Sequence, residues 1–205
     1  VHINDTGEET IELAELLFND NSIHCLNVGQ RKYFDTFHNL FGKYKTWLSK
    51  DDLNVEDFCL MGGGLAAYGI RESKDIDFLT TLEAVPAAPD PSIELETEKP
   101  KYVSASVFDL VHNPEHYFYS DGAKFSSLQI IYELRSKRRR DSDILELETV
   151  KELIASSSCA RSPSLNLKRF LKLAYYKRLV KYCLLTVRFY LRVVLKRGAS
   201  LFRKS

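Results

Sequence analysis

Acidic residues end at Glu152, so the C-terminal part of this 205-residue chain contains no Asp or Glu. Residues 1–160 carry 16 Lys and Arg against 28 Asp and Glu, whereas residues 161–205 carry 13 Lys and Arg against none. The net charge of +1 therefore conceals an acidic body and a basic tail. This distribution indicates that the tail binds an anionic surface.

Paired cysteines are absent as well. The four cysteines are Cys25, Cys59, Cys159 and Cys183, and no two of them are spaced as CxxC. This argues against a disulfide framework or a zinc site and favours reduced thiols in a cytosolic protein. No signal-peptide pattern opens the chain. It begins at Val1 rather than Met, as we expect of a processed product or of a domain excised from a longer protein.

Proline, glycine and acids are all missing from residues 165–197. On a helical wheel the cations and the apolar residues of this stretch occupy separate arcs, which predicts a basic amphipathic helix. Its recurring charges argue against a membrane-spanning helix. We expect it to lie on an anionic membrane, which would make the protein cytoplasmic and peripheral on the inner face. A partner-protein groove is one alternative, and nucleic acid is another that the Leu- and Val-rich arc disfavours.

Two helices are predicted within an N-terminal layer, residues 1–53. A capping box from Thr6 to Glu9 opens the first, which runs to about Asn19. The second, over residues 30–49, has a predicted packing face with three- and four-residue spacing: Phe34, Phe37, Phe41, Tyr44 and Leu48. A core over residues 54–155, a linker over 156–164 and the tail over 165–205 are expected to follow.

Three consecutive glycines, Gly62, Gly63 and Gly64, follow the apolar run 58–61. The run predicts a strand, and residues without a Cβ allow backbone N–H groups to approach a phosphate closely. Residues 65–70 are then expected to form a short helix whose N-terminus points at that anion. The turn is therefore a candidate phosphate-binding site.

Two acids follow this turn at short range. Asp75 and Asp77 flank Ile76 in an alternating stretch, so a strand would place both carboxylates on one face. Such a pair suits Mg²⁺ or Mn²⁺, because Mg²⁺ takes one or two protein carboxylates and completes its shell with water and substrate phosphate oxygens. The pattern predicts that Asp75 and Asp77 are metal ligands and catalytic residues acting on a nucleoside triphosphate.

This layout resembles the polymerase-β-like nucleotidyltransferase superfamily, whose pattern is Gly-Gly or Gly-Ser, a gap of about ten residues, and Asp-x-Asp or Asp-x-Glu. Residues 65–74 form that gap here. Residues 124–141 are similar to the basic helix that follows the catalytic strands in small members, with Arg140 where Lys is usual and a third glycine where Ser can stand. The resemblance covers about residues 55–150. It implies an α/β (α+β) fold with a short mixed sheet flanked by helices.

The resemblance also implies roles for basic residues of the second segment. Lys137 and Arg138, within the basic cluster 135–140, are expected to bind triphosphate oxygens. The alternative is charge balance within an acidic domain, for example through an i,i+4 pair between Glu133 and Lys137. Both roles are compatible.

A third carboxylate is usual in such enzymes. Residues 102–111 alternate in a way that predicts a strand, and Asp109 on it is the candidate ligand or general base. Glu94 and Glu96 are other candidates, and helix capping or solvation is the competing role for Asp109. Residues 83–100 hold four of the six prolines and are expected to be a surface loop, acting as a lid or as a disordered insertion.

These patterns predict a Mg²⁺-dependent nucleotidyl- or phosphoryl-group transferase. Residues 117–125 resemble domains that accompany bacterial surface-polysaccharide synthesis, which implies a glycan or lipid-linked sugar as acceptor. Two alternatives remain. One is a catalytically silent scaffold of the same fold that anchors a partner at the membrane, and the other is a small RNA- or protein-modifying nucleotidyltransferase.

Overall fold

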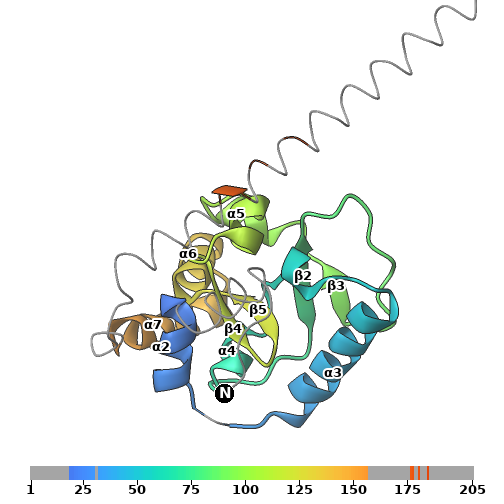
Figure 1. Cartoon of the computed structure of the whole chain (residues 1–205). Helices are drawn as coiled ribbons and strands as arrows, with labels where there is room; N and C mark the ends of the chain where they lie inside the picture. The colour runs from blue at the N-terminus through green and yellow to red at the C-terminus, as the bar shows by residue number, and fades with distance from the viewer. Residues whose placement is uncertain (1–18, 31, 157–175, 178–179, 181–183, 185–205) are drawn as a thin grey trace, which may run out of the picture.

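The computed structural model describes residues 19–30 and 32–156, together with residues 176, 177, 180 and 184. The described chain is a mixed α/β fold in which helices flank a five-stranded mixed sheet (Figure 1). The strands are β1 Phe58–Leu60, β2 Ile76–Thr80, β3 Ile93–Leu95, β4 Tyr117–Ser120 and β5 Ala123–Ser126. The α-helices are α2 Asp20–Val28, α3 Asp35–Lys50, α4 Gly64–Ala67, α5 Val107–His112, α6 Leu128–Arg138 and α7 Asp141–Ala155, and the 3₁₀ turns are η1 Val55–Asp57 and η2 Lys99–Tyr102.

The sheet has the strand order β3-β2-β1-β5-β4. Its central strand, β1, is antiparallel to β2 and parallel to β5, while β3 is parallel to β2. Strands β4 and β5 form a hairpin closed by Asp121 and Gly122, whose φ angles of 52° and 76° are those of a type I′ turn. Helix α3 lies on the side of β2 and β3 in Figure 1, and α2, α6 and α7 gather on the side of β4 and β5.

Hydrophobic side chains cover both faces of this sheet. One core joins α3 to Phe58, Phe78 and Phe125, and its members include the predicted packing face of that helix. The other core lies on the opposite face, where Cys59 and Leu79 pack with apolar residues of α5. Side chains alternate between the faces of a strand, so Asp77 shares a face with Leu79.

Several predicted elements are confirmed with altered boundaries. Helix α3 begins at Asp35 rather than at residue 30. The helix predicted over residues 65–70 has one turn, because Gly69 adopts a left-handed φ of 73° and turns the chain against Gln30. Residues 83–100 are not a disordered insertion, since they contain β3 and the start of η2. Helix α2, capped by Asn19, was missed.

The strand predicted over residues 102–111 is wrong. This stretch holds the end of η2 and most of α5, which begins after Ser106. The Ser106 hydroxyl accepts the backbone N–H of Asp109 at 3.1 Å, and this N-cap favours a helix where alternation alone suggested a strand. Asp109 is therefore in the first turn of a helix.

The predicted first helix and its capping box lie outside the described residues, apart from Asn19. The linker after Ser156 and the basic tail also lie outside them, except for the four helical positions 176, 177, 180 and 184. Among the described residues, no helix is long and apolar enough to cross a membrane.

A buried ammonium group joins three elements of the described chain. Lys124 of β5 is 1 % exposed, and its Nζ donates to the carbonyl oxygen of Val111 at 2.8 Å and to that of Glu56. The Glu56 carboxylate lies 3.4 Å from the same Nζ. A buried charge is tolerated only when it is paired and hydrogen-bonded, so Lys124 fixes η1 and α5 against the sheet.

We expect Lys124→Met to lower the free energy of unfolding by about 3 kcal/mol, because it removes the cation that pairs buried acceptors. Urea denaturation measures this change. Lys137→Met is the matched control, since Lys137 is exposed and pairs with Glu133 on one helix, a pair worth about 0.5 kcal/mol. Equal losses in the two variants would contradict the role of Lys124.

Candidate functional site

A hollow of about 230 Å³ lies where β1, β2, α4 and α6 meet. Its wall includes the predicted glycines Gly62–Gly64 and both predicted acids, Asp75 and Asp77. The structure therefore brings together the two parts of the pattern that the sequence separates by ten residues.

Asp77 lies on β2 with its side chain 17 % exposed. Its carboxylate oxygen Oδ2 contacts the ammonium group of Lys99, which also lies 2.9 Å from Glu96 Oε2. Burial raises the pKa of Asp77, and Lys99 offsets part of that rise while Asp75 adds to it. This carboxylate is thus incompletely compensated by the cation beside it.

Asp75 immediately precedes β2 and is exposed at the same hollow. The hydroxyl group of Ser73 donates to Asp75 Oδ1 at 3.1 Å or to the Asp75 backbone carbonyl at 3.0 Å. Ser73 is buried, so it orients the Asp75 side chain without shielding it from solvent.

The glycines also have a packing role that was not predicted. The backbone N–H groups of Met61 and Gly62 both donate to the Asp77 carbonyl oxygen, at 2.8 and 3.2 Å. A Cβ on Gly62 would lie 2.9 Å from Asp77 Oδ2. Gly63 has a φ of 76°, and its Cβ would lie 2.7 Å from the Phe37 ring. These two glycines are required by the packing of the protein on itself.

Guanidinium groups form the basic part of the wall. Arg138, as predicted, lines the hollow, and its Nε and Nη2 donate to the Asp143 carboxylate at 2.8 and 2.6 Å. Arg135 pairs with Glu146, and burial lowers the pKa of Arg135 to about 10, so it stays protonated at neutral pH. Arg140 lines the hollow from an exposed position.

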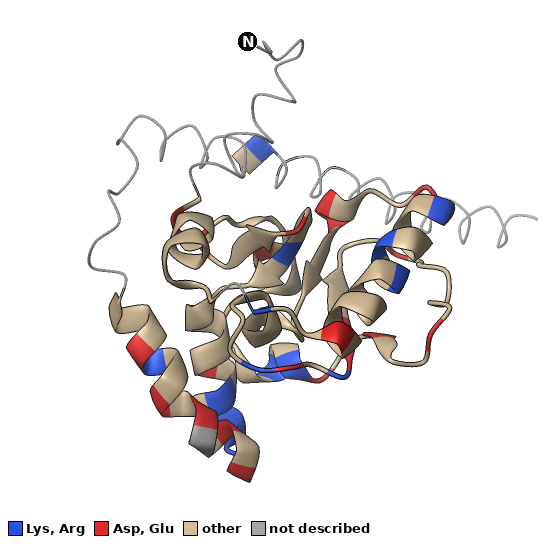
Figure 2. Ribbon diagram, turned by 90° about the horizontal axis from the view of Figure 1, so that it is seen from below, with Lys and Arg blue, Asp and Glu red and all other residues tan. Residues whose placement is uncertain are grey.

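Lys137, in contrast, does not line the hollow. Its ammonium group lies 2.7 Å from Glu133, which confirms the i,i+4 pair. Figure 2 shows acidic and basic residues interspersed over the described chain rather than segregated. Local charge balance therefore accounts for Lys137.

Two cations of the hollow were not predicted. Lys99 is placed by η2, and Arg71 by the segment between α4 and β2, where its Nε lies 3.0 Å from Glu146. Neither belongs to a basic cluster in the sequence. The proline-rich segment 83–100, which contains Lys99, was a partial signal for it, because a lid would lie beside the acids.

The structure does not bring the candidate third carboxylates to the hollow. Asp109 accepts a hydrogen bond from the Ser106 hydroxyl at 2.6 Å and is not part of the wall. Glu94 pairs with Asp77 in the β2–β3 register but is exposed, and Glu96 approaches Asp77 through Lys99. Within the described residues, no three His, Cys, Asp or Glu side chains are grouped to hold a metal ion.

Comparison of the chain with models of known protein families, with curated proteins and with solved structures finds no match. The arrangement of the hollow itself, together with the sequence pattern that predicted it, is the basis for a functional proposal.

We expect Gly63→Ala to lower the free energy of unfolding by at least about 2 kcal/mol, because it adds left-handed strain to a contact with Phe37. Gly62→Ala should cost less, since its Cβ meets the end of the Asp77 side chain, and should instead weaken ligand binding at the hollow.

Urea denaturation and calorimetry with Mn²⁺ separate these effects. Gly122→Ala is the control for backbone strain alone, because Gly122 has a φ of 76° with no atom near its Cβ position. If Gly63→Ala is no less stable than Gly122→Ala, the Phe37 contact does not matter.

Proposed function

We propose that the protein is a Mg²⁺-dependent nucleotidyl- or phosphoryl-group transferase related to polymerase-β-like nucleotidyltransferases. The observation that carries this proposal is the meeting of Asp75 and Asp77 with Arg135, Arg138 and Arg140 around one hollow. Carboxylates hold a metal and guanidinium groups hold phosphate oxygens, so both ends of a metal–triphosphate complex find partners there.

The donor set fits a divalent metal ion. Asp75 and Asp77 supply carboxylate oxygens, and the open hollow leaves room for the water and phosphate oxygens with which Mg²⁺ completes its shell. Desolvation of Asp77 favours an added positive charge. When bound, Mg²⁺ would polarise a phosphoryl oxygen and neutralise charge that develops during transfer.

The arginines would orient the phosphates. Arg138 uses two of its five N–H donors on Asp143, so others remain for a ligand. Arg140 is exposed at the wall and can adjust its position. Holding a triphosphate in one orientation lowers the barrier to transfer because the loss of freedom occurs on binding.

Lys99 supports a second candidate function. Its ammonium group already neutralises part of the Asp77 charge, as a metal ion would. A catalytically silent domain of the same fold could therefore bind phosphorylated ligands without a metal. This form corresponds to the scaffold alternative, in which the basic tail would anchor a partner at the membrane.

The remaining parts of the proposal rest on sequence. A glycan or lipid-linked sugar is the proposed acceptor, and a small RNA- or protein-modifying transferase is the alternative. The proposed location is the cytoplasmic face of an anionic membrane, through residues 165–197, with nucleic acid as a less favoured partner of that segment.

We expect Asp77→Asn to reduce Mg²⁺-dependent nucleotide transfer by about 100-fold or more, because it removes a metal-binding charge while keeping the side-chain size. Thermal unfolding should change little, since the charge that is lost is poorly solvated and Glu96 still pairs with Lys99. Transfer is measured as pyrophosphate release from each nucleoside triphosphate, and binding by calorimetry with and without Mg²⁺.

Asp109→Asn is the control and should retain activity, because Asp109 lies outside the hollow. A fully active Asp77→Asn variant, or a wild-type protein that binds no nucleotide with Mg²⁺, would remove the transferase proposal. Equal loss in both variants would support the sequence-based role of Asp109.

The two candidate functions differ in what Lys99→Met does. For the transferase, the variant should bind Mn²⁺ alone about 10-fold more tightly, because an ammonium group no longer competes for Asp77. For the silent domain, wild type binds a triphosphate without metal and the variant binds it more weakly. Lys101→Met is the control, since Lys101 is exposed and pairs with Glu98.

A further inference from the structure

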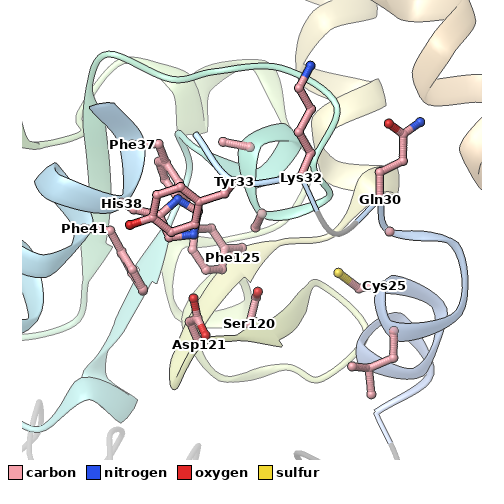
Figure 3. A pocket seen from close by; sticks show the side chains of 14 residues that line it. Cys25, Gln30, Lys32, Tyr33, Phe37, His38, Phe41, Ser120, Asp121 and Phe125 are labelled. Carbon is pink, nitrogen blue, oxygen red and sulfur yellow. The ribbon is translucent and has the colours of Figure 1, made fainter. Parts of the chain in front are cut away.

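A second pocket, of about 350 Å³, lies beside α4 (Figure 3). Ala66 belongs to its wall and to the wall of the hollow that contains Asp75 and Asp77, which we call the phosphate hollow. One helical turn therefore borders both spaces. None of the acids and arginines of the hollow lines this second pocket. Its chemistry is therefore separate from the metal and phosphate chemistry proposed above.

Aromatic rings form one side of this pocket. The Tyr33 and His38 rings stack with centroids 3.8 Å apart and planes inclined by 23°. Phe37 meets His38 edge to face, and Phe41 and Phe125 complete the apolar floor. Tyr33 is 66 % exposed, so much of its ring is accessible to a ligand.

Hydrogen-bond acceptors face the rings. In Figure 3 the side chains of Ser120 and Asp121 lie across the pocket from Tyr33 and His38, and the Cys25 thiol lies at a third side. Asp121 is exposed at the hairpin turn, where its φ is 52°. A ligand with N–H or O–H donors would find acceptors on this side of the pocket.

His38 adds to this preference. Its Nδ1 lies 2.9 Å from the carbonyl oxygen of Phe34, and since a carbonyl only accepts, Nδ1 carries the proton. In the neutral ring Nε2 is then an acceptor. The pocket thus combines a flat apolar surface with acceptors at His38 and Asp121, while Gln30 and Ser120 can both donate and accept.

A cationic ligand fits this arrangement poorly. Lys32 lines the pocket, and the Lys45 ammonium group lies 4.8 Å from the Phe41 ring centroid and 3.4 Å from the Asp121 carbonyl oxygen. Phe37 and Phe41 also stack on each other, so their faces do not surround a common space as in an aromatic cage. A neutral ligand with a planar ring is favoured instead.

One part of the wall is held in position before any ligand arrives. The backbone N–H of Gln30 donates to the Tyr68 carbonyl oxygen at 2.8 Å, which ties Gln30 to the end of α4. A Cβ on Gly69 would lie 1.8 Å from the Gln30 carbonyl oxygen, so the two segments are in direct contact. A preformed wall reduces the ordering that binding requires.

We infer that this pocket binds a neutral nucleobase that carries an exocyclic amino group, of the adenine or cytosine type. The ring stacks on Tyr33, as bases stack on exposed aromatic side chains. The amino group donates to the Asp121 carboxylate, an acceptor that suits such groups. This site takes the base of a separate ligand and does not require the phosphate hollow.

The test uses nucleosides, which lack phosphate, so that the hollow makes no contribution. Adenosine and cytidine are titrated into the full chain by calorimetry, with uridine, which has no amino group, and arginine as competing ligands. We expect adenosine or cytidine to bind more tightly than uridine and arginine. Tyr33→Ala should weaken that binding about 5- to 100-fold through loss of stacking.

Asp121→Asn should weaken the binding of the amino-bearing base and reduce its advantage over uridine, and Asn tolerates the left-handed backbone at this turn. Tyr132→Ala is the matched control, because Tyr132 is a partly exposed tyrosine on α6 outside the pocket, and it should bind as wild type does.

Asp77→Asn should also leave nucleoside binding unchanged, which separates this inference from the transferase proposal. Failure of adenosine and cytidine to bind, equal binding of uridine, tighter binding of arginine, or an equal loss in Tyr132→Ala would each overturn the inference.

Discussion

The junction between β1 and β2 is the constraint on which both the sheet and the candidate site depend. The Asp77 carbonyl oxygen accepts N–H groups from Met61 and Gly62, while Asp77 Oδ2 lies 2.9 Å from the position that a Cβ on Gly62 would take. The same residue therefore fixes the strand register through its backbone and supplies the acid through its side chain. A one-residue slip in this register would turn Asp77 to the opposite face of the sheet.

Charge in the hollow is balanced by pairs that come from different elements. Lys99 reaches Asp77 from η2, Asp143 of α7 holds Arg138 of α6, and Glu146 of the same helix contacts Arg135. Partly buried charges of this kind are stable only when they are paired. A phosphorylated ligand would enter a site whose groups are already oriented, which reduces the reorganisation needed on binding.

Residue spacing along the sequence predicted the features that depend on neighbouring residues. The three- and four-residue spacing of Phe37, Phe41 and Tyr44 identified the buried face of α3, and the spacing of the acids identified the hollow. The proline-rich segment was only a partial signal for Lys99, because the contact with Asp77 depends on the pairing of β2 with β3, which precedes η2. Alternation misled the prediction over residues 102–111, where the Ser106 cap decides in favour of a helix. Gly63 was predicted as a phosphate-binding residue, and the sequence could not show its packing against Phe37, because that ring is distant in sequence.

The two halves of the proline-rich segment differ in their tolerance of insertions and deletions. Residues 81–92 connect β2 to β3. We expect a change in length before Asp90 to leave the pairing of Asp77 with Glu94 intact, whereas Asp90 itself accepts the backbone N–H groups of Ser92 and Ile93. Residues 96–98 connect β3 to η2, and there Glu96 accepts the backbone N–H groups of Glu98 and Lys99 at 2.7 and 3.0 Å. One residue added to this short connection would move the Lys99 ammonium group away from the hollow. Among relatives of this chain, length variation in the segment should therefore be confined to the part that precedes Asp90.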